Sequence, residues 1–197
     1  MTPQALRLSI IILAAGASQR LGQPKQLVKY KGKSLTQRAI QNAGSVAPHE
    51  ILVITGAGAE AVQTEVQKTS AQCVHNPNWS NGMATSIAKG AQSVDESSQG
   101  LMILLCDQWR ILPEDLKRLV KTWHNDPSMI VCSATKGHCG PPVIFPATYL
   151  EELAAMTGDH GARGIIKMHS DSVSQVMLEN AAFDLDTNSQ LNELENA

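Results

Sequence analysis

Aromatic residues are scarce in this sequence. Only 4% of its residues are Phe, Trp or Tyr, whereas hydrophobic residues of all kinds make up 43%. The core must therefore be built mainly from Ala, Val, Ile and Leu. Charged residues account for 17%, a proportion typical of globular proteins rather than disordered ones.

The sequence also lacks a concentration of positive charge. Its formal net charge is -2 at pH 7, and it has no long basic run. Because binding a nucleic-acid backbone requires a concentrated positive surface, nucleic acid is excluded as the main partner. No stretch approaches the roughly 20 apolar residues that cross a membrane, so no membrane partner is expected.

The N-terminal region contains a feature that mimics a targeting signal. Arg7 precedes an apolar run at residues 8–15, and the small residues Ala15, Gly16 and Ala17 resemble a cleavage site. A buried first strand is favoured instead, because cleavage there would cut in two the phosphate-binding pattern described below.

Paired or metal-spaced cysteines are missing as well. The four cysteines form no C-x-x-C pair and no zinc-ligand spacing, and they stand at Cys73, Cys106, Cys132 and Cys139. Three of them lie in or beside apolar stretches, where a free Cys behaves as a small hydrophobe. A reduced, cytoplasmic setting is predicted.

Short apolar runs alternate with segments of helical periodicity along most of the chain. Strands are predicted at residues 8–13, 50–54, 72–75, 101–105, 129–133, 143–145 and 173–177, and helices at 34–43, 59–67, 83–91, 113–123, 149–156 and 162–168. This alternation predicts an α/β fold: a three-layer α/β/α sandwich around a mostly parallel, Rossmann-like sheet.

The pattern indicates one domain spanning residues 1–197, since we find neither an internal repeat nor a low-complexity linker. The polar tail at 188–197 is expected to fray. Ligands of such open sheets bind at the carboxyl ends of the strands. The informative loops are therefore those that follow Leu13, Ile54, His75 and Leu105.

The loop after the first predicted strand is the richest in chemistry. Residues 13–27 read LAAGASQRLGQPKQL, which combines small residues, two glycines and two cations. Small residues allow backbone N–H groups to approach a phosphate closely, and Arg20 and Lys25 supply positive charge. The loop is neither a Walker A motif, because no Gly-Lys-Ser/Thr closes it, nor a Rossmann fingerprint.

This run resembles the signature L-A-[AG]-G-x-S-x-R-[ML]-G-x-x-K of the nucleotidyltransferases related to molybdenum cofactor cytidylyltransferases and guanylyltransferases, and every fixed position matches. The resemblance implies that Arg20 and Lys25 are catalytic, because they neutralise the triphosphate and the departing pyrophosphate. Within this family, LAAG rather than LAGG accompanies cytidylyl transfer, which favours CTP over GTP. The nucleotide-binding residues implied here are Leu13, Ala14, Ala15 and Gly16, with Ala15 and Gly16 acting through backbone groups.

A second match lies in the middle of the chain. Residues 76–86, NPNWSNGMATS, are similar to the family's N-x-x-[WY]-x-x-G-[MR]-x-x-S. The resemblance places Gly82, Met83 and Ser86 near the base and ribose. From the residues alone, a turn followed by a capped helix accounts for the segment equally well.

Two aspartates are candidates for a metal site. Asp107 ends a buried strand, where a carboxylate is costly unless it faces a cation or a ligand. The family's [AC]-D-[QM]-P pattern implies that Asp107 binds Mg²⁺, although Trp109 replaces the usual proline here. Asp186, within a segment similar to the family's D-[IV]-D-T, is implied as a second ligand.

The C-terminal third carries the implied acceptor site. Segments 140–145 and 158–163 are similar to the family's G-x-P-x-x-[FL] and G-D-x-G-A-R. The resemblance implies that Pro142, Asp159 and Arg163 bind the acceptor, with Arg163 suited to a phosphate. His138 and Cys139 are adjacent, but neither has a partner at metal-ligand spacing.

The resemblance as a whole implies transfer of CMP from CTP to molybdenum-bearing molybdopterin, with Mg²⁺ as cofactor and pyrophosphate as product. A monomer is expected, with transient contact to a molybdoenzyme or its chaperone. Three alternatives stay open: another triphosphate such as GTP, another acceptor such as a sugar or isoprenoid phosphate, and a carrier that binds the cofactor without catalysis.

An oxidoreductase is a competing class. Residues 56–61, GAGAEA, fit G-x-G-x-x-[GA] between a predicted strand and a predicted helix. Dinucleotide binding also requires an acidic residue about 20 positions further on, where this chain has HNPN. A tight strand-to-helix turn is therefore favoured.

Overall fold

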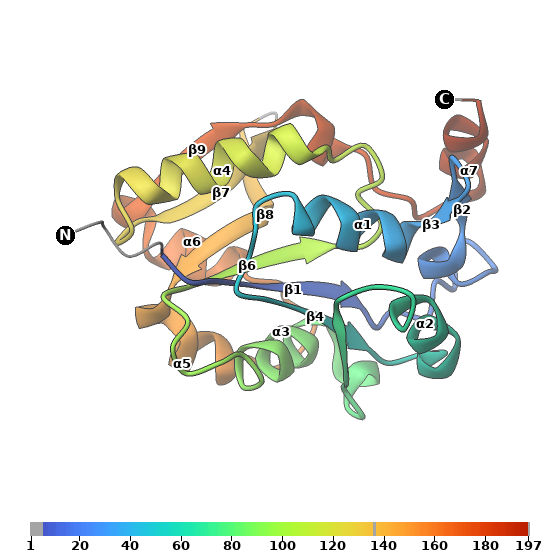
Figure 1. Ribbon diagram of the computed structural model, residues 1–197, viewed down its shortest axis with the longest axis horizontal. Helices are drawn as coiled ribbons and strands as arrows, with labels where there is room; N and C mark the ends of the chain where they lie inside the picture. Colours follow the sequence, from blue (N-terminus) through green and yellow to red (C-terminus); the bar gives the residue numbers. More distant parts are fainter. Residues whose placement is uncertain (1–5, 136, 197) are drawn as a thin grey trace.

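The computed structural model describes residues 6–135 and 137–196, and a seven-stranded sheet of order β5-β4-β1-β6-β8-β7-β9 runs through its centre (Figure 1). Among the described strands of this seven-stranded sheet only β8 runs antiparallel, pairing in that sense with both β6 and β7. The mostly parallel α/β sheet is therefore confirmed. The strands are β1 (Leu8–Ala14), β4 (Glu50–Thr55), β5 (Gln72–His75), β6 (Gly100–Leu105), β7 (Ile130–Thr135), β8 (His138–Pro146) and β9 (Val173–Met177).

Helices cover both faces of the sheet and complete the predicted three layers. One core cluster joins the sheet to α1 (Leu35–Gly44), α2 (Ala59–Val66) and α4 (Pro113–Asn125). A second cluster joins the opposite face to α3 (Met83–Ala91), α5 (Leu150–Ala154) and α6 (Arg163–Met168). Figure 1 shows α1 and α4 above the sheet and α3 and α5 below it. Short 3-10 helices lie at Lys25–Leu27, Trp79–Asn81, Ala147–Tyr149, Ser170–Ser172 and Glu179–Ala182.

Among the described residues, no helix has the length and apolar character needed to pass through a bilayer.

The first strand shows why the sequence folds this way. All seven residues of β1 are buried, and alternate side chains pack on opposite faces of the sheet. Ile10 and Ile12 belong to the cluster under α1 and α4, whereas Ile11 and Leu13 belong to the cluster under α3. Continuous apolar character therefore places β1 in the centre of the sheet, with its carboxyl end available to a ligand.

Two parts of the structure lie outside the predicted elements. A small hairpin forms from β2 (Lys29–Tyr30) and β3 (Lys33–Ser34), and a helix, α7 (Asn188–Glu195), follows the last strand. The expectation that the polar tail frays is therefore wrong as far as Glu195. Thr187 caps this helix in a capping box with Gln190, and Leu194 is buried against the hydrophobic cluster around Trp109.

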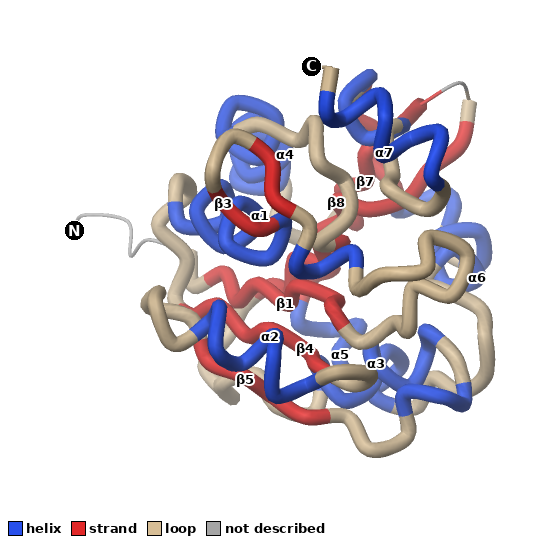
Figure 2. Tube along the Cα trace, turned by 90° about the vertical axis from the view of Figure 1, so that its right-hand side faces the viewer, coloured by secondary structure: helices blue, strands red, loops and turns tan. Residues whose placement is uncertain are grey.

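The parallel strands β1, β4, β5 and β6 all end at the same edge of the sheet, because β1 pairs in parallel with β4 and β6, and β4 with β5. Figure 2 views the molecule from this side, with β1, β4 and β5 next to one another and α2 and α3 close by. The loops that the sequence singled out are thereby brought together.

Candidate active site

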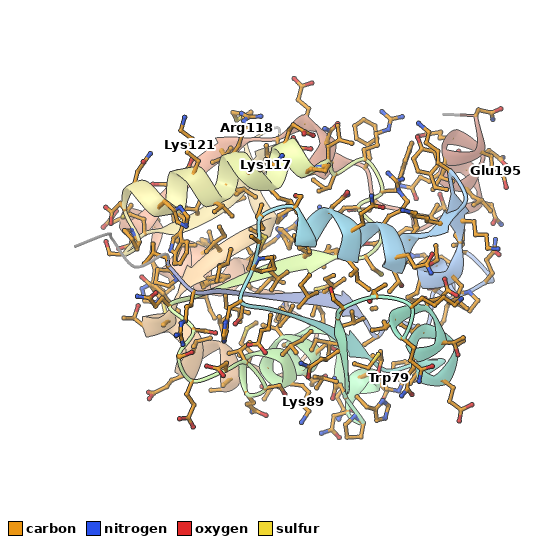
Figure 3. The ribbon with its side chains drawn as sticks, viewed as in Figure 1. Trp79, Lys89, Lys117, Arg118, Lys121 and Glu195 are labelled. Atoms are coloured by element: carbon orange, nitrogen blue, oxygen red, sulfur yellow. The ribbon has the colours of Figure 1, made fainter. Side chains whose placement is uncertain are left out.

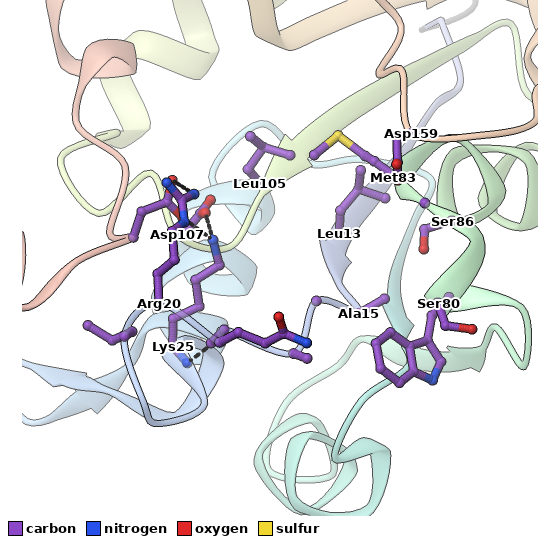
Figure 4. Close-up of a pocket in the computed structure, with 18 residues that line it drawn as sticks. Leu13, Ala15, Arg20, Lys25, Ser80, Met83, Ser86, Leu105, Asp107 and Asp159 are labelled. Carbon is purple, nitrogen blue, oxygen red and sulfur yellow. Dashed lines mark hydrogen bonds and ion pairs between the residues drawn. The ribbon is translucent and has the colours of Figure 1, made fainter.

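A cleft of about 550 Å³ opens at this edge of the sheet (Figure 4). Five separate segments of the chain line it. They are the signature loop after β1, the turn before α3, the end of β6, the loop before α6 and the segment before α7. The lining residues are Leu13, Ala15 to Leu21, Lys25, Trp79, Ser80, Gly82, Met83, Ser86, Leu105, Asp107, Asp159 and Asp186.

The signature loop is held in shape by a buried glutamine. Gln26 is only 1% exposed, and its Nε2 donates to the carbonyl oxygens of Ala14 at 3.1 Å and Gly16 at 2.6 Å. Ser18 adopts a left-handed conformation with φ of 54°, and its Oγ accepts a hydrogen bond from the Lys25 backbone N–H at 3.1 Å. A Cβ on Gly16 would meet no atom within 4 Å, so a ligand can reach the backbone there.

Lys25 joins the two aspartates of the predicted metal site. Its Nζ contacts Asp107 Oδ2 and lies 2.8 Å from Asp186 Oδ1. Burial lowers the pKa of Lys25, but the two carboxylates outweigh burial and leave this pKa raised, so the lysine stays charged. Arg20 approaches the same group from the surface, with Nη2 2.9 Å from Asp186 Oδ2.

Negative charge exceeds positive charge within this group. Burial, together with the charges of Asp107 and Asp186, raises the pKa of Asp184 to about 6. For Asp186 itself, burial raises the pKa, but Lys25 and Arg20 outweigh it and leave the pKa lowered. An additional cation would therefore be attracted to these three carboxylates.

The donor set fits a divalent ion that shares its coordination with phosphate. Oδ1 of Asp107 and Oδ1 of Asp184 are buried without a hydrogen-bond partner in the described part of the protein. No group of three His, Cys, Asp or Glu side chains converges as a metal cage among those residues. Mg²⁺ is commonly held by one or two carboxylates, with substrate phosphates and water completing its shell. The free oxygen of Asp107 fits that pattern, whereas both oxygens of Asp186 are held by Lys25 and Arg20, so Asp186 as a second ligand stays a prediction.

The region after Asp107 is built around Trp109. Its ring is 5% exposed and packs edge-to-face against Tyr30, at 5.2 Å between centroids, and Phe183, at 6.5 Å. The carbonyl oxygen of Asp107 accepts hydrogen bonds from the N–H groups of Trp109 at 2.9 Å and Leu185 at 3.1 Å. The residue that replaces the usual proline thus packs the Asp107 loop against the segment that carries Asp186.

The structure gathers most of the predicted nucleotide residues around the cleft. Leu13, Ala15, Gly16, Arg20 and Lys25 line it from β1 and the loop that follows. Gly82, the N-cap of α3, and Met83 and Ser86 in its first turn line it as well. Ala14 differs, because its side chain is 1% exposed within the core beneath α1. Near the cleft, the carbonyl oxygen of Ala14 accepts a hydrogen bond from Gln26.

The predicted acceptor residues are not gathered in one place. Asp159 lines the cleft. Pro142 instead faces a small depression shared with Trp109, and Arg163 lines a separate depression of about 360 Å³ with His138 and Lys167. Their assignment to the acceptor therefore stays a prediction.

Sequence reasoning gave no site role to Ser18, Gln26, Trp79 and Asp184. The signal for Gln26 was its place next to Lys25 in the signature, although a glutamine there gives no indication that it is buried. Asp184 belongs to the same DLDT segment as Asp186. Its burial near two other carboxylates depends on how α7 and the Trp109 cluster pack.

Residues 10–173 match the family of MobA-like NTP transferase domains. The chain belongs to this family. It is a nucleotidyltransferase with the corresponding Rossmann-like fold, as the signature predicted.

The relatives that this chain matches are named for different activities. Over 166 residues the chain is 28% identical to a nicotine blue oxidoreductase of Paenarthrobacter nicotinovorans, and the match covers 80% of each chain. Over 84 residues it is 30% identical to the molybdenum cofactor cytidylyltransferase of Escherichia coli K12, covering 43% of this chain and 44% of the relative.

A solved structure has nearly the same fold throughout. Rv0371c of Mycobacterium tuberculosis H37Rv superposes with a TM-score of 0.85 at 24% identity, covering 98% of this chain and 100% of the other. A further structure of Rv0371c is a complex with manganese.

Proposed function

We propose that this nucleotidyltransferase transfers CMP from CTP to a phosphorylated small acceptor, with molybdenum-bearing molybdopterin as the acceptor. The observation that carries the proposal is the contact of Lys25 with both Asp107 and Asp186, next to the open backbone of Gly16. This arrangement suits a triphosphate and its metal ion better than any neutral ligand.

The reaction forms one bond and breaks one. An oxygen of the acceptor's phosphate attacks the α-phosphorus of CTP, and the bond from that phosphorus to the α–β bridging oxygen breaks as pyrophosphate leaves. Lys25 and Arg20 neutralise the charge that accumulates on the leaving group, while the signature loop holds the phosphates in line. Bound at Asp107 and Asp186, Mg²⁺ would act as a Lewis acid that offsets phosphate charge.

CTP is proposed as the donor on two grounds. The LAAG sequence at residues 13–16 is the form that accompanies cytidylyl transfer in the family resemblance. The relative from Escherichia coli K12 is named a cytidylyltransferase, and its match extends over 84 residues. Asp159 in the cleft, with Pro142 and Arg163 beyond it, is proposed to bind the acceptor.

A second candidate arises from the relative named an oxidoreductase, whose match covers 80% of this chain. A nicotinamide dinucleotide would then be the nucleotide bound. The G-x-G turn at residues 56–61 does not favour this candidate, because Gly58, Ala59 and Ala61 line a depression other than the cleft of Lys25 and Asp107.

Pyrophosphate release tests the proposal. The purified protein is incubated with Mg²⁺, molybdenum-loaded molybdopterin and, in turn, CTP, GTP, ATP or UTP. Release with CTP alone supports the full proposal, and release with another triphosphate keeps the mechanism but changes the base. Lys25→Met serves as the inactive control, and Lys121→Met, an exposed lysine on α4 (Figure 3), as its matched partner.

Two results would contradict the proposal. No release with any triphosphate, while CTP still binds, indicates another acceptor or a carrier without turnover. Consumption of a reduced nicotinamide dinucleotide that persists in Lys25→Met favours the oxidoreductase.

A further inference from the structure

Trp79 is a half-buried aromatic residue of the cleft that the phosphate chemistry leaves without a role. It begins the short 3-10 helix before α3 and lines the cleft together with Ala15 and Gly16 (Figure 3). The other two tryptophans, Trp109 and Trp123, are 5% and 0% exposed. Because Trp79 lines the cleft, a ligand there can reach it, and an indole ring is well suited to stacking.

A glycine in the loop after β4 allows Trp79 to lie there. A Cβ on Gly56 would stand 2.5 Å from Cβ and 2.6 Å from Cγ of Trp79, and 2.8 Å from the carbonyl oxygen of Ala15. The N–H of Ala57 donates to the same carbonyl at 3.0 Å. Close approach of Trp79 and the signature loop thus accounts for the first glycine of the G-x-G turn, with no dinucleotide required.

The segment that carries Trp79 is fixed by a buried asparagine. Asn76 is 2% exposed, and its Nδ2 donates to the hydroxyls of Thr85 at 2.9 Å and Ser86 at 3.0 Å. Its Oδ1 accepts a hydrogen bond from the N–H of Asn78 at 3.0 Å. These bonds hold both ends of the turn, so the indole is in place before any ligand binds.

The charged residues and Trp79 lie toward different ends of the cleft. In Figure 4, Arg20, Lys25 and Asp107 group on one side, whereas Ala15, Ser80 and Ser86 group on the other. Ala15 and Ser80 are also the neighbours of Trp79, through the Gly56 contact and along the chain. A nucleotide whose phosphates meet Lys25 would therefore present its base toward the Trp79 end.

We propose that Trp79 stacks on the base of the bound nucleoside triphosphate and that Gly56 is the positioning residue for its ring. The inference rests on the proposed function, because it requires a triphosphate in this cleft. Every base has a π face, so stacking on Trp79 adds affinity for the nucleotide without selecting cytosine.

The inference is tested by measuring how tightly Trp79→Leu and Trp79→Phe bind CTP and inorganic tripolyphosphate. Tripolyphosphate has no base. Loss of stacking raises the KM for CTP about 10-fold or more in Trp79→Leu, with kcat changed by no more than about 2-fold. Trp79→Phe keeps an aromatic ring and stays within about 3-fold of the wild type. Inhibition by tripolyphosphate is unchanged in both variants.

Intrinsic fluorescence supplies a second signal, because Trp79→Phe is expected to keep its binding of CTP while it lacks the indole that CTP contacts. CTP is expected to quench the tryptophan fluorescence of the wild type but not that of Trp79→Phe. The control variant is Trp123→Phe, whose substitution lies in the core under α4, and its fluorescence should be quenched as in the wild type. The inference is overturned if Trp79→Leu binds CTP like the wild type, or if CTP and tripolyphosphate weaken by the same factor. If the wild type binds no triphosphate at all, the proposed function fails with it.

Discussion

The ammonium of Lys25 lies 2.8 Å from Oδ1 of Asp186, a residue 161 positions further along the chain. The same ammonium contacts Asp107 at the end of the central strand β6. One side chain of the signature loop therefore links the middle of the chain to its C-terminal segment. It also contacts the carboxylate oxygens that the proposed metal ion would need.

Replacing Lys25 with methionine is expected to lower kcat for pyrophosphate release at least about 100-fold, because a charge-stabilising donor is lost. Methionine is unbranched and only one atom shorter than lysine, so the main change is the loss of the charge and its hydrogen bonds. Steady-state kinetics measure the effect, and circular dichroism establishes that the variant is folded. Lys121→Met should retain the wild-type rate, and near-wild-type turnover of Lys25→Met would refute a catalytic role for Lys25.

The same substitution should strengthen metal binding in the absence of nucleotide. Lys25 and a divalent ion would compete for the oxygens of Asp107 and Asp186. Removing the lysine leaves Asp107 without its cation and Asp186 paired with Arg20 alone. Mn²⁺ should therefore raise the Tm of Lys25→Met more than that of the wild type. Asp107→Asn, added to Lys25→Met, should abolish this increase. An equal Tm shift in Lys25→Met and the wild type would show that the lysine does not compete with the metal.

The sequence predicted the layers of the fold and most of the cleft because both depend on local signals. Apolar runs such as residues 101–105 identify the central strands, and the carboxyl ends of parallel strands necessarily share an edge. Arg20, Lys25 and Asp107 could be placed in one site from their positions after β1 and β6. That argument requires no knowledge of side-chain packing.

Contacts that depend on packing between distant segments could not be predicted in this way. The hydrophobic face of α7 consists of only a few residues in a polar tail, and its burial depends on Trp109. Gly56 fits a dinucleotide motif in the sequence, yet its neighbour in space is Trp79. Arg163 is predicted to share the acceptor with Asp159, yet the two residues line different depressions although only three loop residues lie between them in the sequence.

Asp184 should make stability depend on pH. Burial, together with Asp107 and Asp186, raises its folded-state pKa to about 6, above the ordinary value of 3.8. Between these two values the folded state binds more protons than the unfolded state, so stability falls as pH rises, and the loss is complete above about pH 6. Asparagine cannot ionise, so Asp184→Asn should not lose stability in this way as pH rises.

Thermal unfolding in the presence of EDTA, between pH 4 and pH 8, measures the difference. The Tm of Asp184→Asn minus that of the wild type should increase as pH rises toward about 6. Above that pH the difference should stay constant. Asp171→Asn, at an exposed position between α6 and β9, is the matched control and should follow the wild type. A constant difference between Asp184→Asn and the wild type over the whole pH range would contradict the prediction.

Trp109 should contribute substantially to stability, because its buried ring joins the Asp107 loop to Phe183 and to the cluster under α7. Trp109→Ala is expected to lower the free energy of unfolding by about 3–5 kcal/mol, the usual cost of removing a large buried aromatic side chain. Urea denaturation measures the free energy of unfolding. Met168 is 75% exposed, so the control Met168→Ala should change this free energy by about 0.5 kcal/mol or less.

Trp109→Phe should lose less stability than Trp109→Ala and keep turnover, because a smaller ring still packs between the two segments. A loss below about 1 kcal/mol in Trp109→Ala would mean that the hydrogen bond from the Leu185 N–H to the Asp107 carbonyl oxygen suffices to hold the two segments together.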